Sequence, residues 1–192
     1  MEPRYKLKTA AAFSPVTIAE LKSNLRILHT DQDTYLQALL DAAVVDAQEI
    51  TGRQFARATY TAYLDSYPSV GELELTLGPV AAISSVKYYA QDAIALTTVS
   101  ASDYQLDNVE LTARLRFLNS FSTDSNKMNA VEIEFTTGWA TAAEIEKSIK
   151  DAIILIASER FLTPDNAADN YGSGVKLKAA DRLLQRYKVQ RY

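Results

Sequence analysis

The sequence predicts an α+β fold: helical segments near both ends form one bundle, and an antiparallel β module is inserted between them. Apolar side chains recur at three- and four-residue spacing in the first and last parts of the chain, and at two-residue spacing between residues 57 and 135. At 192 residues and 47% hydrophobic, the chain can bury one core, or a core with a smaller satellite. We predict an N-terminal arm and helices over 1–56, the β module over 57–138, and helices with a basic tail over 139–192.

The first segment, residues 1–15, is predicted to be an extended arm. Pro3 and Pro15 bracket a stretch without a sustained period, and each proline disfavours a helix in the residue before it. Thr17 and Glu20 then form a T-x-x-E capping box, in which each residue bonds the backbone of the other. A short helix should therefore begin immediately after Thr17.

A second helix is predicted over residues 31–51. Thr30 followed by Asp33 offers another capping signal, and apolar residues then recur at helical spacing as far as Ile50. Gly52 can adopt the left-handed conformation that ends a helix.

The middle of the chain is predicted to be a set of antiparallel strands with one solvated face. The clearest run is VEIEFTTG (131–138), where apolar residues alternate with glutamate or threonine before a glycine. We expect the polar loop 121–129 to be exposed and mobile. The predicted strands are 59–64, 73–77, 80–89, 96–99, 104–106, 115–118 and 131–135.

Two more helices are predicted near the C-terminus. Thr141 and Glu144 repeat the capping box, and an apolar stripe predicts a helix that Pro164 must end. The stretch TPDNAADNYGSG (163–174) has the composition of a flexible linker. Leucines and alanines at helical spacing then predict a last short helix that reaches Tyr187.

Charge is unevenly distributed along the chain. Residues 176–192 carry six cations and one acid, a net charge of +5, and residues 1–8 carry +2. Since the whole chain carries −4, residues 9–175 carry −11. A body of that sign should not bind DNA tightly, whereas the basic end can seek an acidic partner surface. The alternative is that the basic end is simply solvated and complements its own helix dipole.

The residue types that support catalysis or metal binding are sparse. His29 is the only histidine and cysteine is absent, which excludes a Cys–His pair and Cys-based zinc sites. An EF-hand loop beginning at Asp31 would need glycine and glutamate where the chain has Leu36 and Ala42. The GSG at 172–174 lacks the context of a phosphate loop. We predict no cofactor, no metal and no enzymatic activity.

Two groups of polar residues have a structural and a functional interpretation. Glu72, Glu74, Glu132 and Glu134 could pair for acid–base work, but their strict alternation with apolar residues favours the solvated face of a sheet. The eleven tyrosines could stack on nucleic acid, but they lie in the acidic body without interleaved cations. A place in a sheet or at a protein interface explains them better.

Features of a membrane or secreted protein are not found in the sequence. There is no run of 18 or more apolar residues, and MEPRYKLKTAAAF lacks the long apolar stretch of a signal peptide. We therefore expect no membrane contact and folding in a cytoplasm.

In their order, the segments resemble the head–tail connector (adaptor) family of tailed bacteriophages, also described as DNA-packaging proteins. The resemblance runs through VTIAELKSNLRI with the following DQD, the alanine-rich helix that closes on TGR (51–53), and GPVAAISSVKYY. It continues through SDYQLDN, VEIEFTTGWA, EIEKSIKDAIILIASERFL and the terminal LLQRYK. It thus covers nearly the whole chain.

The resemblance implies a structural virion protein of the neck, assembled in the host cytoplasm. Family members form a ring, a dodecamer, beneath the portal protein, extend the DNA channel and carry a downstream stopper or tail-completion protein. Double-stranded DNA would only pass through, without specific contacts. A closed ring needs two different patches on each subunit, and segments 1–15, 119–129 and 163–174 are candidates to exchange between neighbours.

The basic tail is the candidate site for portal docking, and we expect it to be disordered until it binds. Deletion of residues 185–192 should then leave folding intact and abolish attachment to the portal. The candidate docking residues are Arg182, Arg186, Tyr187, Lys188, Arg191 and Tyr192.

The alternative function is a cytoplasmic α+β binding module or small hydrolase with a cleft between bundle and sheet.

Overall fold

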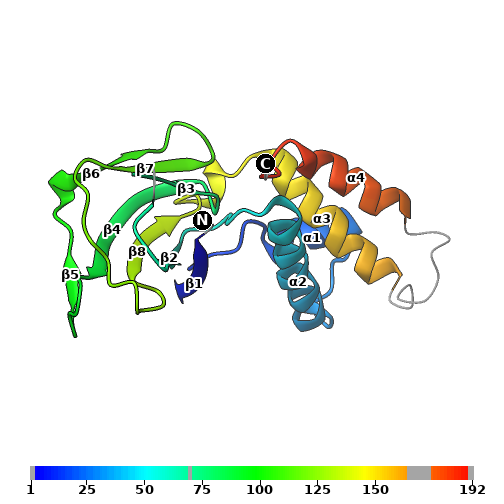
Figure 1. Cartoon of the computed structure of the whole chain (residues 1–192). Helices are drawn as coiled ribbons and strands as arrows, with labels where there is room; N and C mark the ends of the chain where they lie inside the picture. Colours follow the sequence, from blue (N-terminus) through cyan, green and yellow to red (C-terminus); the bar gives the residue numbers. More distant parts are fainter. Residues whose placement is uncertain (1–2, 69–70, 164–173, 190–192) are drawn as a thin grey trace. The chain divides into compact units, whose positions relative to one another are not determined.

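The computed structural model describes residues 3–68, 71–163 and 174–189 (Figure 1). By its internal contacts the chain divides into two units. The β unit contains Met1–Ala12 and Ala56–Trp139, and the helical unit contains Phe13–Phe55 and Ala140–Tyr192. The α+β class, with strands inserted between helical segments, is confirmed.

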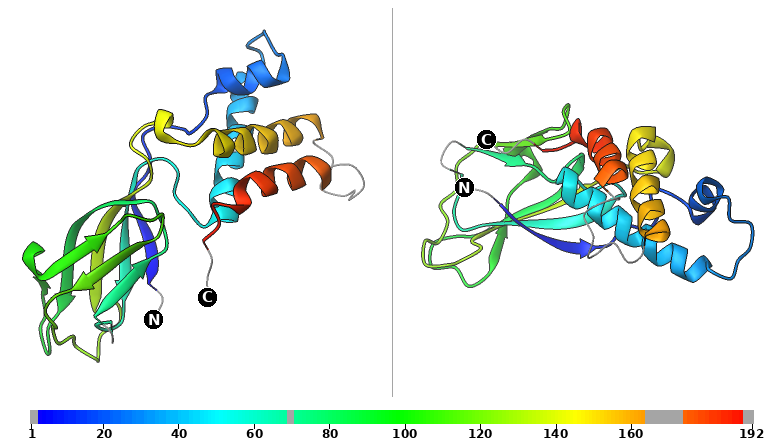
Figure 2. Two further views of the ribbon diagram at one scale, coloured as in Figure 1. Left: turned by 90° about the horizontal axis from the view of Figure 1, so that it is seen from above. Right: turned by 90° about the vertical axis from the view of Figure 1, so that its right-hand side faces the viewer.

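Two antiparallel sheets form the β unit, one in the order β1-β2-β8-β4-β5 and one in the order β3-β7-β6 (Figures 1 and 2). Buried side chains of both sheets share one core, in which Ile133 and Phe135 of β8 are fully buried. All strands except β1 lie where alternation predicts them. The strands are β1 (Arg4–Thr9), β2 (Ala58–Leu64), β3 (Glu72–Leu75), β4 (Val80–Tyr89), β5 (Leu96–Thr98), β6 (Tyr104–Asp107), β7 (Ala113–Phe117) and β8 (Val131–Thr137).

Strand β1 corrects the interpretation of the N-terminus. The prediction that residues 1–15 form an arm grouped with the helices is wrong for 4–9, which pair antiparallel with β2. Tyr5 accounts for the pairing, because its ring lies 5.9 Å from that of Phe135 between centroids. Its hydroxyl oxygen also accepts the backbone N–H of Thr76 at 3.0 Å. Burial of Tyr5 raises the pKa of its hydroxyl.

The loop before β8 is more firmly held than its composition predicts. Phe121 contacts the rings of Tyr67 and Tyr88, at 4.7 and 4.3 Å between centroids. Asp124 is only 4% exposed. The expectation of an exposed loop over 121–129 is therefore wrong for Phe121 and Asp124, since an aromatic residue in a polar loop can complete a core.

The helical unit contains four α-helices and a short 3₁₀ turn among the described residues. Helices α2 and α3 are tied by an ion pair between Asp46 and Arg160, and α1 is tied to the start of α2 by Lys22 and Asp33 at 2.6 Å. In the described part of the chain, no helix combines the length and hydropathy that crossing a membrane requires. The elements are α1 (Ile18–Leu25), α2 (Asp33–Thr51), η2 (Ala142–Glu144), α3 (Lys147–Leu162) and α4 (Gly174–Gln185).

Two sequence signals at helix ends are confirmed. The capping box has both bonds: the Glu20 N–H donates to Thr17 Oγ1 at 3.3 Å, and the Thr17 N–H donates to Glu20 Oε2 at 2.7 Å. That second bond is the main cause of a lowered pKa of the Glu20 carboxyl. Gly52 ends α2 with a φ of 68°, the left-handed conformation that favours glycine.

Two other capping signals do not start helices. Thr141 and Glu144 flank the 3₁₀ turn η2, and α3 begins only at Lys147. The Glu144 carboxylate instead accepts the N–H of Ala140 at 3.0 Å. Helix α2 begins two residues later than predicted, and Thr30 forms a backbone turn to its first residue rather than a side-chain cap.

The last strand of the β unit ends in a tight approach of two backbones. Gly138 has a φ of 93°, and a Cβ at this position would lie 2.6 Å from the carbonyl oxygen of Ala56. The N–H of Arg57 donates to the carbonyl of Trp139 at 3.0 Å, and Ala56 and Trp139 form an isolated bridge. The chain segments that enter and leave the β unit at residues 56 and 139 are therefore tied together.

Acid is expected to destabilise the protein in part through Asp65. The N–H of Asn129 and then the guanidinium of Arg4 hold the pKa of Asp65 below its usual value. A carboxyl whose pKa is lower when folded stabilises the protein above its unfolded pKa, and this contribution is lost as the pH falls through the folded pKa. We expect the free energy of unfolding to decrease below about pH 4.

Urea unfolding across a series of acidic buffers measures this effect. The variant Asp65→Asn should show a shallower decrease than the wild type, because the titrating group is gone. Glu110→Gln, which changes an exposed carboxyl in the turn between β6 and β7, is the control. Equal acid profiles for the wild type and Asp65→Asn would contradict the assignment.

Candidate interaction surfaces

The candidate docking residues of the C-terminal segment divide into three groups. Arg182 lies exposed on α4, and Arg186 lies exposed just after it. Lys188 has a side chain that is 40% exposed and lies 3.2 Å from the carboxylate of Asp181. Two others, Arg191 and Tyr192, lie outside the described residues.

Tyr187 differs from the other members of the set because it is only 2% exposed. Its hydroxyl donates to Glu146, and its carbonyl oxygen accepts the Nε–H of Arg53. The expectation of a disordered tail is therefore wrong as far as residue 189, and Tyr187 is not available to a partner. Deletion of 185–192 would remove a buried side chain, so it should not leave folding intact.

The four glutamates with a possible acid–base role lie on the outer faces of two different sheets. Glu72 pairs with Arg116 on the smaller sheet, and Glu134 pairs with Lys8 on the larger sheet at 2.6 Å. Glu132 and Glu134 line one hollow on the larger sheet, but Lys6, Lys8 and Lys87 line it too, and the other two glutamates lie on the smaller sheet. The solvated-face interpretation agrees with this placement.

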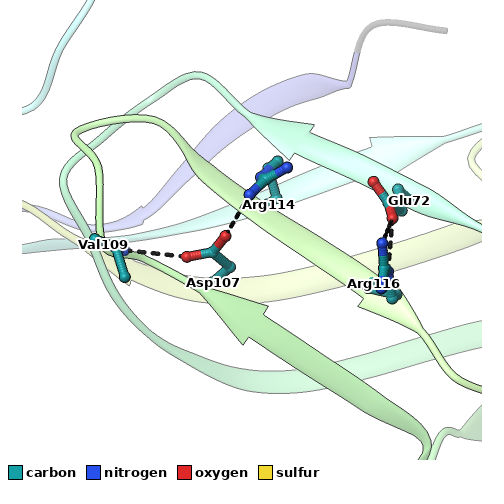
Figure 3. A network of polar contacts seen from close by, with 5 residues as sticks. All are labelled: Glu72, Asp107, Val109, Arg114 and Arg116. Carbon is teal, nitrogen blue, oxygen red and sulfur yellow. Dashed lines mark hydrogen bonds and ion pairs between the residues drawn. The ribbon is translucent and has the colours of Figure 1, made fainter.

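The outer face of the smaller sheet carries alternating charges (Figure 3). Arg114 points to Asp107 on the neighbouring strand at 2.6 Å, and Arg116 of the same strand points to Glu72. The Arg114 guanidinium, with the N–H of Val109, lowers the pKa of Asp107, and the pKa of Arg114 is raised in turn. Carboxylates paired in this way stay ionised and are poor proton donors near neutral pH.

The structure does not place the other candidate residues, such as His29 and Asp31, in a metal site. His29 Nδ1 lies 3.8 Å from a carboxylate oxygen of Asp31, and both side chains are more than half exposed. Within the ranges that the structure describes, no three histidine, cysteine, aspartate or glutamate side chains gather as metal ligands would. Of the GSG at 172–174, the first two residues lie outside the described residues.

Two apolar surfaces were missed by the sequence analysis. A groove in the helical unit is lined largely by apolar residues, among them Phe13, Val16, Ile18, Ala140 and Ala142. Its residues come from both sides of the β module in sequence, so no local pattern reveals it.

The second missed surface is at loop tips of the β unit. Ile94 and Met128 are 95% and 76% exposed. Lys127 links their loops, because its Nζ donates to the carbonyl of Ala93 at 2.5 Å and lies 4.1 Å from the ring centroid of Tyr89. Isolated apolar residues in predicted turns, such as Ile94, are the signal that could have found it.

Three solved structures share this fold over nearly the full length. A chain from the neck of an empty gene transfer agent (GTA) particle, computed with C6 symmetry, has a TM-score of 0.80 and 19% identity, covering 98% of this chain and 97% of that chain. A chain from the virion of the native particle has a TM-score of 0.77 and 20% identity, covering 98% and 96%. A chain from the native neck, computed with C12 symmetry, has a TM-score of 0.73 and 19% identity, covering 98% and 97%.

The sequence comparison gives the family. No curated protein matches the chain. The model of the phage gp6-like head–tail connector proteins matches residues 15–108, which include α1, α2 and the strands β2 to β6. Over these residues the chain thus matches the phage gp6-like head–tail connector family, which confirms the resemblance found in its sequence.

Proposed function

We propose that this chain is a structural head–tail connector, an adaptor in the neck of a tailed phage or a related particle. It extends the DNA channel and provides the platform for the next neck or tail protein. The observation that carries this proposal is the shared fold with GTA neck proteins over 98% of the chain, together with the family match. This role needs no catalysis and no cofactor, and we include both absences in the proposal.

The assembled form that we propose is a homo-oligomeric ring of twelve subunits, by analogy with the native GTA neck, which was computed with C12 symmetry. A ring needs two different, complementary patches on each subunit. Exchange of segment 1–15 between neighbouring subunits has little support, because β1 is paired with β2 of its own chain. Exposed apolar side chains of the helical unit are better candidates for ring contacts, namely Tyr35, Val45 and Leu162, at 47%, 51% and 55% exposure.

The ring would enclose DNA without binding it tightly. Residues 9–175 carry a net charge of −11, so we propose that part of this negative charge faces the lumen. Repulsion of the phosphate backbone would let double-stranded DNA slide through the channel. A strongly basic lumen in the assembled ring would contradict this part of the proposal.

Electron microscopy of the purified protein, alone and with its portal, tests the proposal. We expect closed rings with a central channel, on their own or when the portal is present. Mass measurement in solution gives the number of subunits. A protein that stays monomeric under all these conditions would refute the connector role and favour the alternative of a monomeric binding module.

We further propose that exposed cations of the C-terminal segment dock on an acidic surface of the portal. Reversal of two charges, Arg182→Glu with Arg186→Glu, should weaken attachment to the portal at least about tenfold, because like charges would then face each other. Both side chains are exposed, and the guanidinium of Arg186 lies 5.3 Å from the ring centroid of Tyr187, so the free energy of unfolding should fall by no more than about 1 kcal/mol. Sedimentation of the variant with portal rings measures attachment.

The matched control reverses two exposed cations elsewhere, Lys6→Glu with Lys147→Glu. It makes the same change in net charge and should attach as the wild type does. Equal loss of attachment in both double variants would show that net charge, and not the C-terminal position, controls docking.

A further inference from the structure

The chain that follows α4 is held against the end of α2. The N–H of Val189 donates to the carbonyl of Thr51 at 2.9 Å, and the Nε–H of Arg53 donates to the carbonyl of Tyr187. A Cβ added to Gly52 would lie 3.6 Å from the Cβ of Val189. We call these contacts, with the bond from Tyr187 to Glu146, the C-terminal clip.

The clip is a buried polar arrangement. Tyr187 and Arg53 are 2% and 5% exposed. Burial, followed by the bond to Glu146, raises the pKa of the Tyr187 hydroxyl. If the clip opened, Arg53 would lose a carbonyl acceptor inside the protein, and a buried cation that loses an acceptor is costly.

The clip also sets where the docking cations lie. Arg186 and Lys188 directly flank Tyr187 in the chain, and both are exposed while Tyr187 is buried. The contacts that bury one side chain therefore hold its two neighbours at the surface. A cation held in place loses less conformational entropy on binding than one on a free tail.

We infer that Arg53 is a positioning residue for the C-terminal docking surface, and that the segment docks on an acidic protein surface while the clip is closed. This inference rests on the proposed docking to the portal. It differs from that proposal by assigning a role to a buried residue at the end of α2, and by requiring that residues 187–189 stay packed on their own subunit in the complex.

A disulfide lock tests whether the clip stays closed. The natural chain has no cysteine, so Gly52→Cys with Val189→Cys gives a single pair. The Cβ separation of 3.6 Å is within the range that a disulfide spans. Binding to purified portal rings is measured with the oxidised and the reduced double variant, and with each single variant as a control for strain at position 52.

We expect the oxidised and reduced forms to bind the portal with affinities that agree within about twofold. Loss of binding on oxidation, restored by reduction, would overturn the inference alone, because the clip would then have to open. A wild-type protein that does not bind portal rings at all would overturn the docking proposal and this inference with it.

The variant Arg53→Lys tests the positioning role, because it keeps the charge and removes the Nε–H donor. We expect trypsin to cleave after Arg186 and Lys188 about tenfold faster, and portal affinity to fall by a similar factor, while the fold seen by circular dichroism persists. A lowered melting temperature with unchanged affinity and cleavage would assign Arg53 a purely structural role and overturn the inference.

Discussion

Phe135→Ala is expected to lower the free energy of unfolding of the β unit by about 3–5 kcal/mol. Phe135 is fully buried in the centre of the larger sheet, and its ring contacts Tyr5 and Tyr60, at 5.9 and 6.4 Å between centroids. Removal of the ring leaves a cavity and deprives both tyrosines of packing. Since domains are stabilised by about 5–15 kcal/mol in total, this one change can leave the unit largely unfolded.

The single tryptophan provides the measurement, because Trp139 lies at the end of the β unit and its fluorescence reports unfolding in urea. Ile94→Ala is the control, since it also removes apolar atoms but from a side chain that is 95% exposed. That variant should differ from the wild type by less than about 0.5 kcal/mol. Similar losses in both variants would contradict the packing argument.

Gly138→Ala should have a comparable effect, about 4 kcal/mol, for a different reason. An alanine there must adopt a φ of 93°, which L-residues rarely do, and its Cβ would lie 2.6 Å from the Ala56 carbonyl oxygen. The three nearest atoms are the carbonyl oxygen and carbon of Ala56 and the nitrogen of Arg57, which are backbone atoms that cannot rotate away. The bridge between Ala56 and Trp139 must then separate, so the two chain segments beside it would no longer be held together.

Gly71→Ala separates the two causes of this loss. Gly71 has a φ of 68°, but the nearest atom to its added Cβ is the hydroxyl of Tyr67, at 3.2 Å, on a side chain that can move. The backbone penalty alone should cost about 1–2 kcal/mol. Urea unfolding that gives equal losses at positions 71 and 138 would show that the close backbone approach contributes nothing.

Local signals in the sequence predicted most of the elements. The capping box at Thr17 and the glycine at position 52 work because all their partners lie within four residues. The same pattern at Thr141 failed, because the Glu144 carboxylate bonds the N–H of Ala140 and the chain makes a 3₁₀ turn first. At Thr141 the T-x-x-E pattern therefore marks a 3₁₀ turn, and the α-helix begins only at Lys147.

Features that depend on distant partners could not be predicted. Alternating residues in RYKLKT (4–9) resemble a strand, but its partner begins at residue 58 and the flanking prolines favoured an arm. The division of the strands into two sheets is likewise a choice among long-range pairings.

The docking surface also depends on residues that are distant in the sequence, and this part of it could not be predicted. Its cations were found from composition alone, but the burial of Tyr187 depends on Arg53, which is 134 positions away in the sequence. No spacing rule connects a residue in a basic tail with the end of a helix near the opposite terminus. Sequence reasoning therefore found the charge of the segment and missed the contacts that hold it.

We expect the charges of strand β1 to protect the subunit from aggregation. It forms one edge of the larger sheet, and Arg4, Lys6 and Lys8 put a cation at every second position along it. Charged edge strands discourage pairing with other chains, whereas β2 behind it, ATYTAYL, carries no charge. A subunit shortened by its first nine residues would expose the uncharged edge of β2 to every neighbouring copy. By covering that edge, β1 prevents strand pairing between subunits that are close together.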